Sequence, residues 1–234
     1  MTGVSLIESP QLKRASGFST VLRVITSPVE TYRRLATDPR PFPILTGVTV
    51  LSVFVALMSA PVVRYLLMET PGVSASQTIA NQFVLAQALL LTPFGTVAFL
   101  GIVALFLWAV VLTIGGETTL RHAAAIVFAA GAAGVLKRLF VGCVLYLRWW
   151  LNPSQLGADV TTGLDGLLTP QIVGPLVSLI VQHAGIFDIW FVILVTLGLQ
   201  YCASVPRTQA LTTAGVTFGV VTTVRILVAL AGTA

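Results

Sequence analysis

The sequence predicts an all-α fold, a polytopic membrane helical bundle of five transmembrane helices preceded by an amphipathic interfacial helical segment. The first observation is composition: 56% of the residues are hydrophobic and 9% are charged. Soluble domains carry about 25% charged residues, so this chain cannot cover a water-facing surface. The second observation is that five separate stretches reach the roughly 20 apolar residues that cross about 30 Å of hydrocarbon. The third is a strong bias in where the positive charges fall.

The five predicted spans are residues 42–63, 88–114, 122–147, 186–204 and 210–231. The apolar stretch around the second span is too long for one straight crossing, and Pro93 and Gly95 allow a kink or a break there. We interpret residues 78–92 as the approach to this span, in the form of an outer interfacial turn. The alternative is a hairpin, which would give six spans. Residues 171–184 are apolar but short and interrupted by Gly174 and Pro175, so we expect a re-entrant or interfacial segment.

The positive charges predict the topology. If the N-terminus is inside, eight cations fall on the inner side and two near the outer side: Lys13, Arg14, Arg23, Arg33, Arg34, Arg40, Arg121 and Arg207 against Arg64 and Arg148. Such a bias marks the cytoplasmic side. We therefore expect a multi-pass plasma or inner membrane protein whose N-terminus is cytoplasmic and whose C-terminus is outside. The cations behind the net charge of +5 cluster where this membrane topology requires them, so the charge does not indicate nucleic-acid binding.

The residues before the first span divide into a polar tail, 1–16, and an amphipathic segment, 17–40; residues 41–234 form the five-span domain. Apolar residues recur at helical spacing in the segment: Phe18, Val21, Leu22 and Ile25. Ser27 and Glu30 have the spacing of a capping box, with Pro28 in the first turn. Its arginines are expected to contact anionic headgroups of the inner leaflet: Arg23, Arg33, Arg34 and Arg40. The alternative is a solvated pair of cytosolic helices.

Charges inside or at the ends of the predicted spans are the sharpest signal: Lys137, Arg138, Asp188, Arg225 and Arg64. A charge at the bilayer centre costs about 2.5–3.5 kcal/mol on insertion scales, so such residues are paired or functional. One interpretation pairs Asp188 with Arg138 or Lys137 and lets the other cations reach outward to water. The other holds that one aspartate cannot neutralise the cluster, so a phosphate headgroup or polyprenyl phosphate does. Pairing between subunits is a third.

No catalytic pattern is present in the sequence. There is no His-Glu-x-x-His, Gly-x-Ser-x-Gly or phosphate-binding loop, and His122 and His183 have no partner at ligand spacing. Cys143 and Cys202 indicate neither a disulfide framework nor a metal site. We expect no enzyme activity, no cofactor and no metal.

Small residues predict where helices touch. Gly215 and Gly219 form a Gly-x-x-x-Gly pair, and the third span repeats small residues at four-residue spacing: Ala125, Ala129 and Ala133, then Ala130 and Gly134. Such faces let helix backbones approach closely. They would also serve contact with a membrane-protein partner or a second copy of the chain.

Three stretches together resemble the Yip domain family, the Ypt/Rab-interacting membrane proteins and their prokaryotic relatives. They are "VITSPVETYRRLATDPRPFPILTGV", "GGETTLRHAAAIVFAAG" and "GIFDIWFVILVTLGLQYCASVPRTQAL". In the family, a Ser-Pro-initiated short helix leads into the first span, a Gly-Gly turn precedes the third, and an aspartate and tryptophan begin the fourth. The resemblance covers roughly residues 20–228.

The resemblance implies a five-span fold, an inside N-terminus and a non-enzymatic, membrane-organising or trafficking-related role. The long cytosolic region of the eukaryotic members has no counterpart in this sequence. The small-GTPase role is therefore not carried over, and a prokaryotic-type member is expected. The alternative function is a small transporter or flippase for an anionic lipid or a polyprenyl phosphate.

Overall fold

The computed structural model describes residues 17–68, 75–151 and 185–231, and within these ranges the chain is entirely helical apart from short connections. Seven helices are described: α1 Gly17–Thr26, α2 Pro28–Thr37, α3 Pro41–Met68, α4 Ala75–Thr113, α5 Leu120–Leu151, α8 Ile186–Cys202 and α9 Arg207–Ala231. The all-α prediction is confirmed for these residues. The predicted polar tail 1–16 and the predicted re-entrant segment 171–184 lie outside the described residues.

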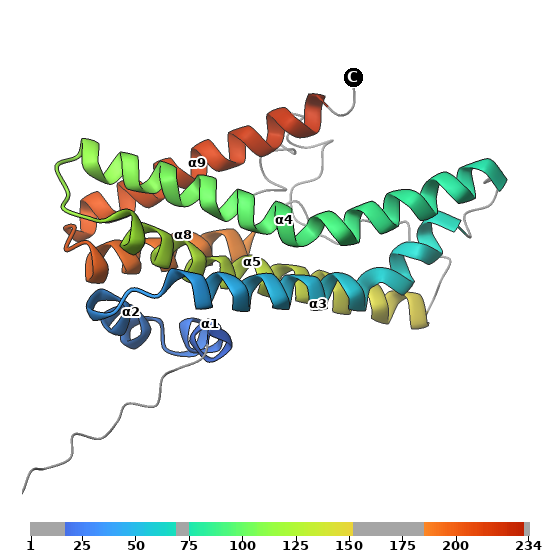
Figure 1. Ribbon diagram of the computed structural model, residues 1–234, viewed down its shortest axis with the longest axis horizontal. Helices are drawn as coiled ribbons and strands as arrows, with labels where there is room; N and C mark the ends of the chain where they lie inside the picture. Colours follow the sequence, from blue (N-terminus) through green and yellow to red (C-terminus); the bar gives the residue numbers. More distant parts are fainter. Residues whose placement is uncertain (1–16, 69–74, 152–184, 232–234) are drawn as a thin grey trace, which may run out of the picture.

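Three helices of the described part are long and apolar enough to cross a membrane. They are Pro41–Val62 of α3, Leu91–Thr113 of α4 and the whole of α5. The apolar α8 has 17 residues and α9 has 25, which correspond to about 26 and 38 Å of helix. Consecutive long helices run in alternating directions along the molecule, with α9 inclined to the others (Figure 1).

The helix α4 corrects the expectation for residues 78–92. It runs unbroken over 39 residues with Pro93 inside it, and it changes direction near its middle (Figure 1). The predicted interfacial turn and the alternative hairpin are therefore both wrong. Proline removes one backbone donor and bends a helix. In apolar surroundings a continued helix still satisfies nearly all other backbone groups, whereas a turn would leave several without partners.

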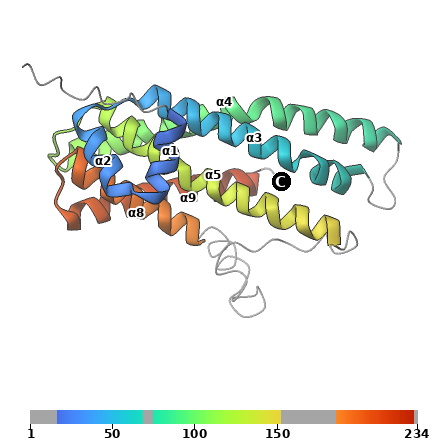
Figure 2. The same cartoon turned by 90° about the horizontal axis from the view of Figure 1, so that it is seen from below.

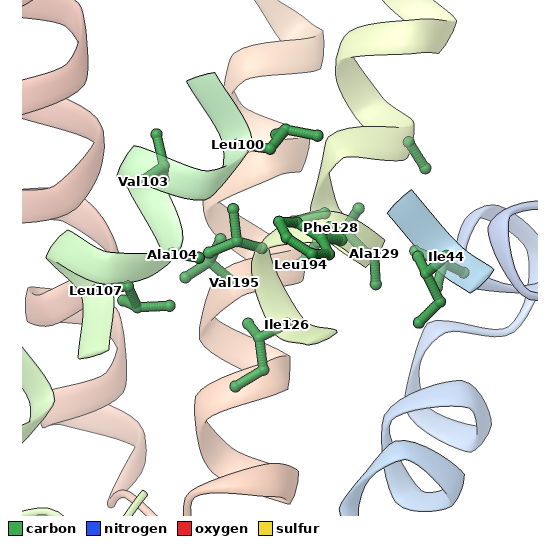
Figure 3. Packing of buried hydrophobic residues seen from close by; sticks show 14 of the residues in the cluster. Ile44, Leu100, Val103, Ala104, Leu107, Ile126, Phe128, Ala129, Leu194 and Val195 are labelled. Atoms are coloured by element: carbon green, nitrogen blue, oxygen red, sulfur yellow. The ribbon is translucent and has the colours of Figure 1, made fainter. Parts of the chain in front are cut away.

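The helix α5 lies at the centre of the packing and contacts α3, α4 and α8. Its first half is built from small residues that are fully buried, among them Ala125, Ala129, Ala130 and Ala133. These alanines are the predicted helix contacts. The same core contains larger side chains, among them Leu100, Val103 and Leu107 of α4 and Leu194 and Val195 of α8, which Figure 3 shows together with Ala129.

The three predicted contact glycines do not touch a neighbouring helix within the part of the chain that the structure describes. A Cβ atom at Gly134, Gly215 or Gly219 would meet no described atom within 4 Å. Gly198, which the sequence analysis did not single out, is the tight position: a Cβ there would lie 2.5 Å from Cγ2 of Ile126. Close packing of α8 on α5 therefore depends on Gly198.

The two short helices α1 and α2 lie across the bundle at the end where α3 begins (Figure 2). A Cβ at Gly17 would lie 1.7 Å from the carbonyl oxygen of Pro43, so α1 crosses α3 at backbone contact. The contacts of α2 are mainly with α8, and both short helices touch α5. Val24 of α1 and Tyr32 of α2 are completely buried, so the pair is part of the folded unit.

The start of α2 differs from the predicted capping box. Ser27 stands at the N-cap and Pro28 at the first helical position, but the Ser27 side chain makes no capping hydrogen bond. Glu30 instead forms an i,i+4 ion pair with Arg34. On an exposed helix surface such a pair competes with the box for the glutamate.

Candidate functional site

A cavity of about 770 Å³ lies among α3, α4, α5, α8 and α9. Its volume is within the range of about 300–1,000 Å³ that is usual for small-molecule sites. The α4 part of the wall is formed by Thr92, Gly95, Thr96, Phe99 and Leu100. Because Pro93 stands among these residues, the bend of α4 lies at the wall of the cavity.

Both cations in the middle of α5 line this cavity together with the aspartate of α8. Nζ of Lys137 lies 2.8 Å from Oδ2 of Asp188. The same carboxylate oxygen accepts the backbone N–H of Gly185 at 3.1 Å, at the N-cap of α8. Asp188 is 8% exposed, so two donors and the positive end of a helix compensate its buried charge. The sequence left two possible partners open for Asp188, namely Arg138 and Lys137. In the structure the ion-pair partner of Asp188 is Lys137.

Arg138 lines the same cavity and is exposed. Within the described residues it forms no ion pair. The charged side chains of the described part that line the cavity are therefore two cations and one anion, an excess of one positive charge. The backbones of Arg64 and Arg225 belong to α3 and α9, but their side chains lie outside the described residues.

Sequence reasoning missed the hydroxyl groups of this cavity. Thr96 is 8% exposed, and its Oγ1 has no hydrogen-bond partner among the described residues. Ser52 of α3 is 2% exposed and lines the cavity from another side. The signal that could have pointed to Thr96 is its position with Thr92 around Pro93, because a proline bends the helix there.

The four arginines predicted for the inner leaflet are all exposed on α1, α2 or the turn after α2: Arg23, Arg33, Arg34 and Arg40. Two of them have local carboxylate partners, Arg34 with Glu30 and Arg40 with Asp38. The guanidinium of Arg33 lies over the Tyr201 ring, 5.4 Å from its centroid. Arg33 therefore has a contact with α8 besides any contact with lipid.

Both ring nitrogens of His122 contact other groups of the protein. Nδ1 of His122 lies 2.8 Å from Thr119 Oγ1, and its Nε2 lies 3.3 Å from the carbonyl oxygen of Ala36. His122 thereby joins the start of α5 to α2. His183 lies outside the described residues. Among the residues with assigned positions, no group of three or more His, Cys, Asp or Glu side chains could hold a metal ion.

One comparison with known proteins gives a match. The family model described as the Yip1 domain matches residues 22–229, from α1 to the last turns of α9. No curated protein matches the chain, and no solved structure matches it.

Proposed function

The chain belongs to the Yip1 domain family of generally non-enzymatic, multi-pass membrane proteins, and on this premise we propose a membrane-organising or interaction role for it, related to trafficking. It works without catalysis. As a prokaryotic-type member it resides in a plasma or inner membrane, and α3, α4, α5, α8 and α9 are its five spans. The positive-inside bias supports a cytoplasmic N-terminus and an outside C-terminus.

One observation carries this proposal: α1 and α2 are fixed to the bundle as an inner platform, which we define as residues 17–37. The platform is attached through Val24, Tyr32 and Leu35, which are at most 6% exposed. A solvated helix pair would have no such anchoring, and its position relative to the membrane would vary. A fixed platform meets the bilayer at a constant height and can act on it.

The opposite side of the platform has the chemistry of a membrane surface. Phe18 and Leu22 are 49% and 48% exposed, and Phe42 at the start of α3 is 76% exposed. Exposed arginines stand on the same two helices. Exposed aromatic and aliphatic groups beside cations are the composition of helices that lie in the headgroup region of anionic membranes.

Hydrogen exchange of the full-length protein in nanodiscs tests the platform. Amides of residues 17–37 should exchange more slowly in anionic than in zwitterionic lipid. The double change Arg23→Glu and Arg33→Glu should remove most of this difference, because each cation near an anionic surface contributes about 1 kcal/mol. The matched control is Arg23→Lys with Arg33→Lys, which keeps both charges and should keep the difference. Equal exchange in the two lipids for the unchanged protein would refute the membrane role of the platform.

A small transporter or flippase for an anionic lipid is the second candidate, and the cavity beside Arg138 favours it. Transport needs a path to the other side of the membrane. The inner half of the described bundle is filled, because Leu107, Ile126 and Leu199 are at most 1% exposed. Packing of this kind supports the organising role. The assay is reconstitution in vesicles with a fluorescent anionic lipid and an outside quencher. Protein-dependent lipid movement between leaflets would overturn the organising role in favour of transport.

A further inference from the structure

We propose that the cavity among α3, α4, α5, α8 and α9 binds a phosphodiester that carries no cationic group and has a net charge of −1, and that Arg138 and Thr96 are its ligands. The inference rests on the proposed function, because it takes these helices to cross a bilayer. It adds to that function a site and the chemical class of its ligand.

The charge balance of the described cavity selects the charge of the ligand. Lys137 and Asp188 neutralise each other at 2.8 Å, which leaves the guanidinium of Arg138 as the uncompensated charge among the described lining residues. A cation in apolar surroundings attracts one counter-charge, and a second negative charge would remain unpaired there. A phosphodiester without a cationic headgroup has a net charge of −1, a zwitterionic one such as phosphatidylcholine has none, and a phosphate monoester carries up to two negative charges.

Arg138 has the right chemistry for phosphate. Its planar guanidinium donates two parallel hydrogen bonds to a phosphate group, which an ammonium cannot do. Lys137 is already held by Asp188, and Asp188 is itself held by the N–H of Gly185. The ion pair therefore acts as a positioning element that keeps the carboxylate away from the anion.

Thr96 supplies an independent observation. Its Oγ1 is buried without a hydrogen-bond partner among the described residues, and the residue lines the same cavity as Arg138 from α4. A buried hydroxyl without a partner is unfavourable, because it has lost its hydrogen bond to water and gained none. A phosphate oxygen in the cavity would accept its hydrogen bond and remove this penalty.

The depth of Arg138 favours a lipid as the source of the phosphodiester. Arg138 lies about 27 Å along α5 from Leu120, and the hydrocarbon core of a bilayer is about 30 Å thick. With the start of α5 at the inner boundary, the guanidinium reaches the depth of the outer-leaflet phosphates. The neighbouring apolar wall, which includes Val55, Phe99 and Phe187, suits the glycerol and first methylenes of a lipid.

The test measures lipid binding to the full-length protein by native mass spectrometry in a neutral detergent. Phosphatidylglycerol is titrated against phosphatidylcholine and phosphatidic acid with identical acyl chains. Glycerophosphoglycerol, the soluble diester with the same headgroup, separates a lipid from a free anion. We expect phosphatidylglycerol to bind most tightly and the soluble diester at least about tenfold more weakly, because it lacks the apolar chains.

Three variants connect the binding to the site. Arg138→Gln should weaken phosphatidylglycerol binding at least about tenfold, and Thr96→Val about threefold to tenfold, because hydrogen bonds to a charged group are strong. Arg121→Gln is the matched control, since it makes the same change on the same helix at the exposed start of α5. It should leave the affinity unchanged. Thr96→Val keeps the side-chain volume, so it remains informative if Arg138→Gln fails to fold.

The contrary outcomes are equally specific. Equal binding of phosphatidylglycerol and phosphatidylcholine, or equal losses for Arg121→Gln and Arg138→Gln, would overturn the site. Tighter binding of phosphatidic acid would overturn the single-charge rule, and equal binding of the soluble diester would overturn the lipid source. All these readouts are independent of exchange in residues 17–37, so failure of this site and failure of the proposed function are distinguishable.

Discussion

Nζ of Lys137 in α5 and Oδ2 of Asp188 in α8 lie 2.8 Å apart, with side chains that are 27% and 11% exposed. The pair joins two helices that are separated in the chain by the connection between residues 151 and 186. Asp188 also accepts the N–H of Gly185, so the first turn of α8 and the middle of α5 are held by one carboxylate. This pair leaves Arg138, the next residue along α5, free to face the cavity.

The first prediction is energetic coupling between Lys137 and Asp188. In a double-mutant cycle with Lys137→Gln and Asp188→Asn, the coupling energy should exceed about 0.5 kcal/mol. It should stay below the 3–5 kcal/mol that is typical of breaking fully buried pairs, because the Lys137 side chain is partly exposed. Asparagine keeps an acceptor for the Gly185 N–H, so the cycle isolates the charge. Thermal unfolding in detergent is the measurement.

The control is a second double-mutant cycle, in which Arg138 is changed instead of Lys137. Arg138→Gln combined with Asp188→Asn should give additive losses, because no ion pair joins these two residues in the structure. Coupling in the Arg138 cycle and none in the Lys137 cycle would show that the aspartate pairs with the other cation.

The second prediction compares two glycines. Gly198→Ala should destabilise the protein by about 1–3 kcal/mol, the usual effect of overpacking, because the new Cβ would lie 2.5 Å from Ile126 Cγ2 and 3.1 Å from Tyr32 Cε1. Gly215→Ala is the matched control in α9, where a Cβ would meet none of the described atoms within 4 Å. It should be neutral or slightly stabilising, since alanine favours the helix by up to about 1 kcal/mol. Equal effects of the two changes on thermal stability would contradict the packing of α8 against α5 and α2.

The third prediction concerns the phenol of Tyr32 in α2. Its hydroxyl is buried and has no hydrogen-bond partner among the described residues, so Tyr32→Phe should be neutral or stabilising at pH 7. A loss above about 1 kcal/mol would mean that the hydroxyl has a partner such as a bound water.

The same residue makes stability depend on pH. Burial raises the pKa of the Tyr32 phenol well above its ordinary value, and the neighbouring Cys202 raises this pKa further. In the unfolded chain a tyrosine ionises at about pH 10. Above this pH the unfolded state releases a proton that the folded state keeps, so stability falls as pH rises. Thermal unfolding at pH 8 and at pH 10.5 should therefore show a smaller loss for Tyr32→Phe than for the unchanged protein. Identical losses would place the phenol in contact with water.

The fourth prediction is topological. A reporter fused before Met1 should be cytoplasmic, and one fused after Ala234 should be outside, because the five spans that we propose would place the two ends on opposite sides. A third reporter, inserted in the turn at Gly115 and Gly116 between α4 and α5, should lie on the cytoplasmic side. Both ends on one side would require an even number of spans.

The helical class and the positions of the long apolar helices were predictable because they depend on local properties. Runs of apolar residues and their breaks mark helices without knowledge of their neighbours. α3 begins at Pro41 and α5 at Leu120, within two residues of the predicted starts of 42 and 122. The second span was misjudged because a proline inside an apolar stretch permits a bend as well as a break. Only the surroundings of Pro93 decide which one forms.

The sequence by itself determined that this is a helical membrane protein with a charged cluster near Lys137, since composition, periodicity and charge position require no contacts. Tertiary structure alone decided that Asp188 takes Lys137 and that Arg138 faces a cavity with Thr96. Adjacent residues on a helix point about 100° apart. The choice between Lys137 and Arg138 therefore depends on how α5 is rotated against α8. We attribute that rotation to the close approach of Gly198 to Ile126 and to the buried alanines of α5. No local sequence pattern specifies the contacts of these residues with neighbouring helices.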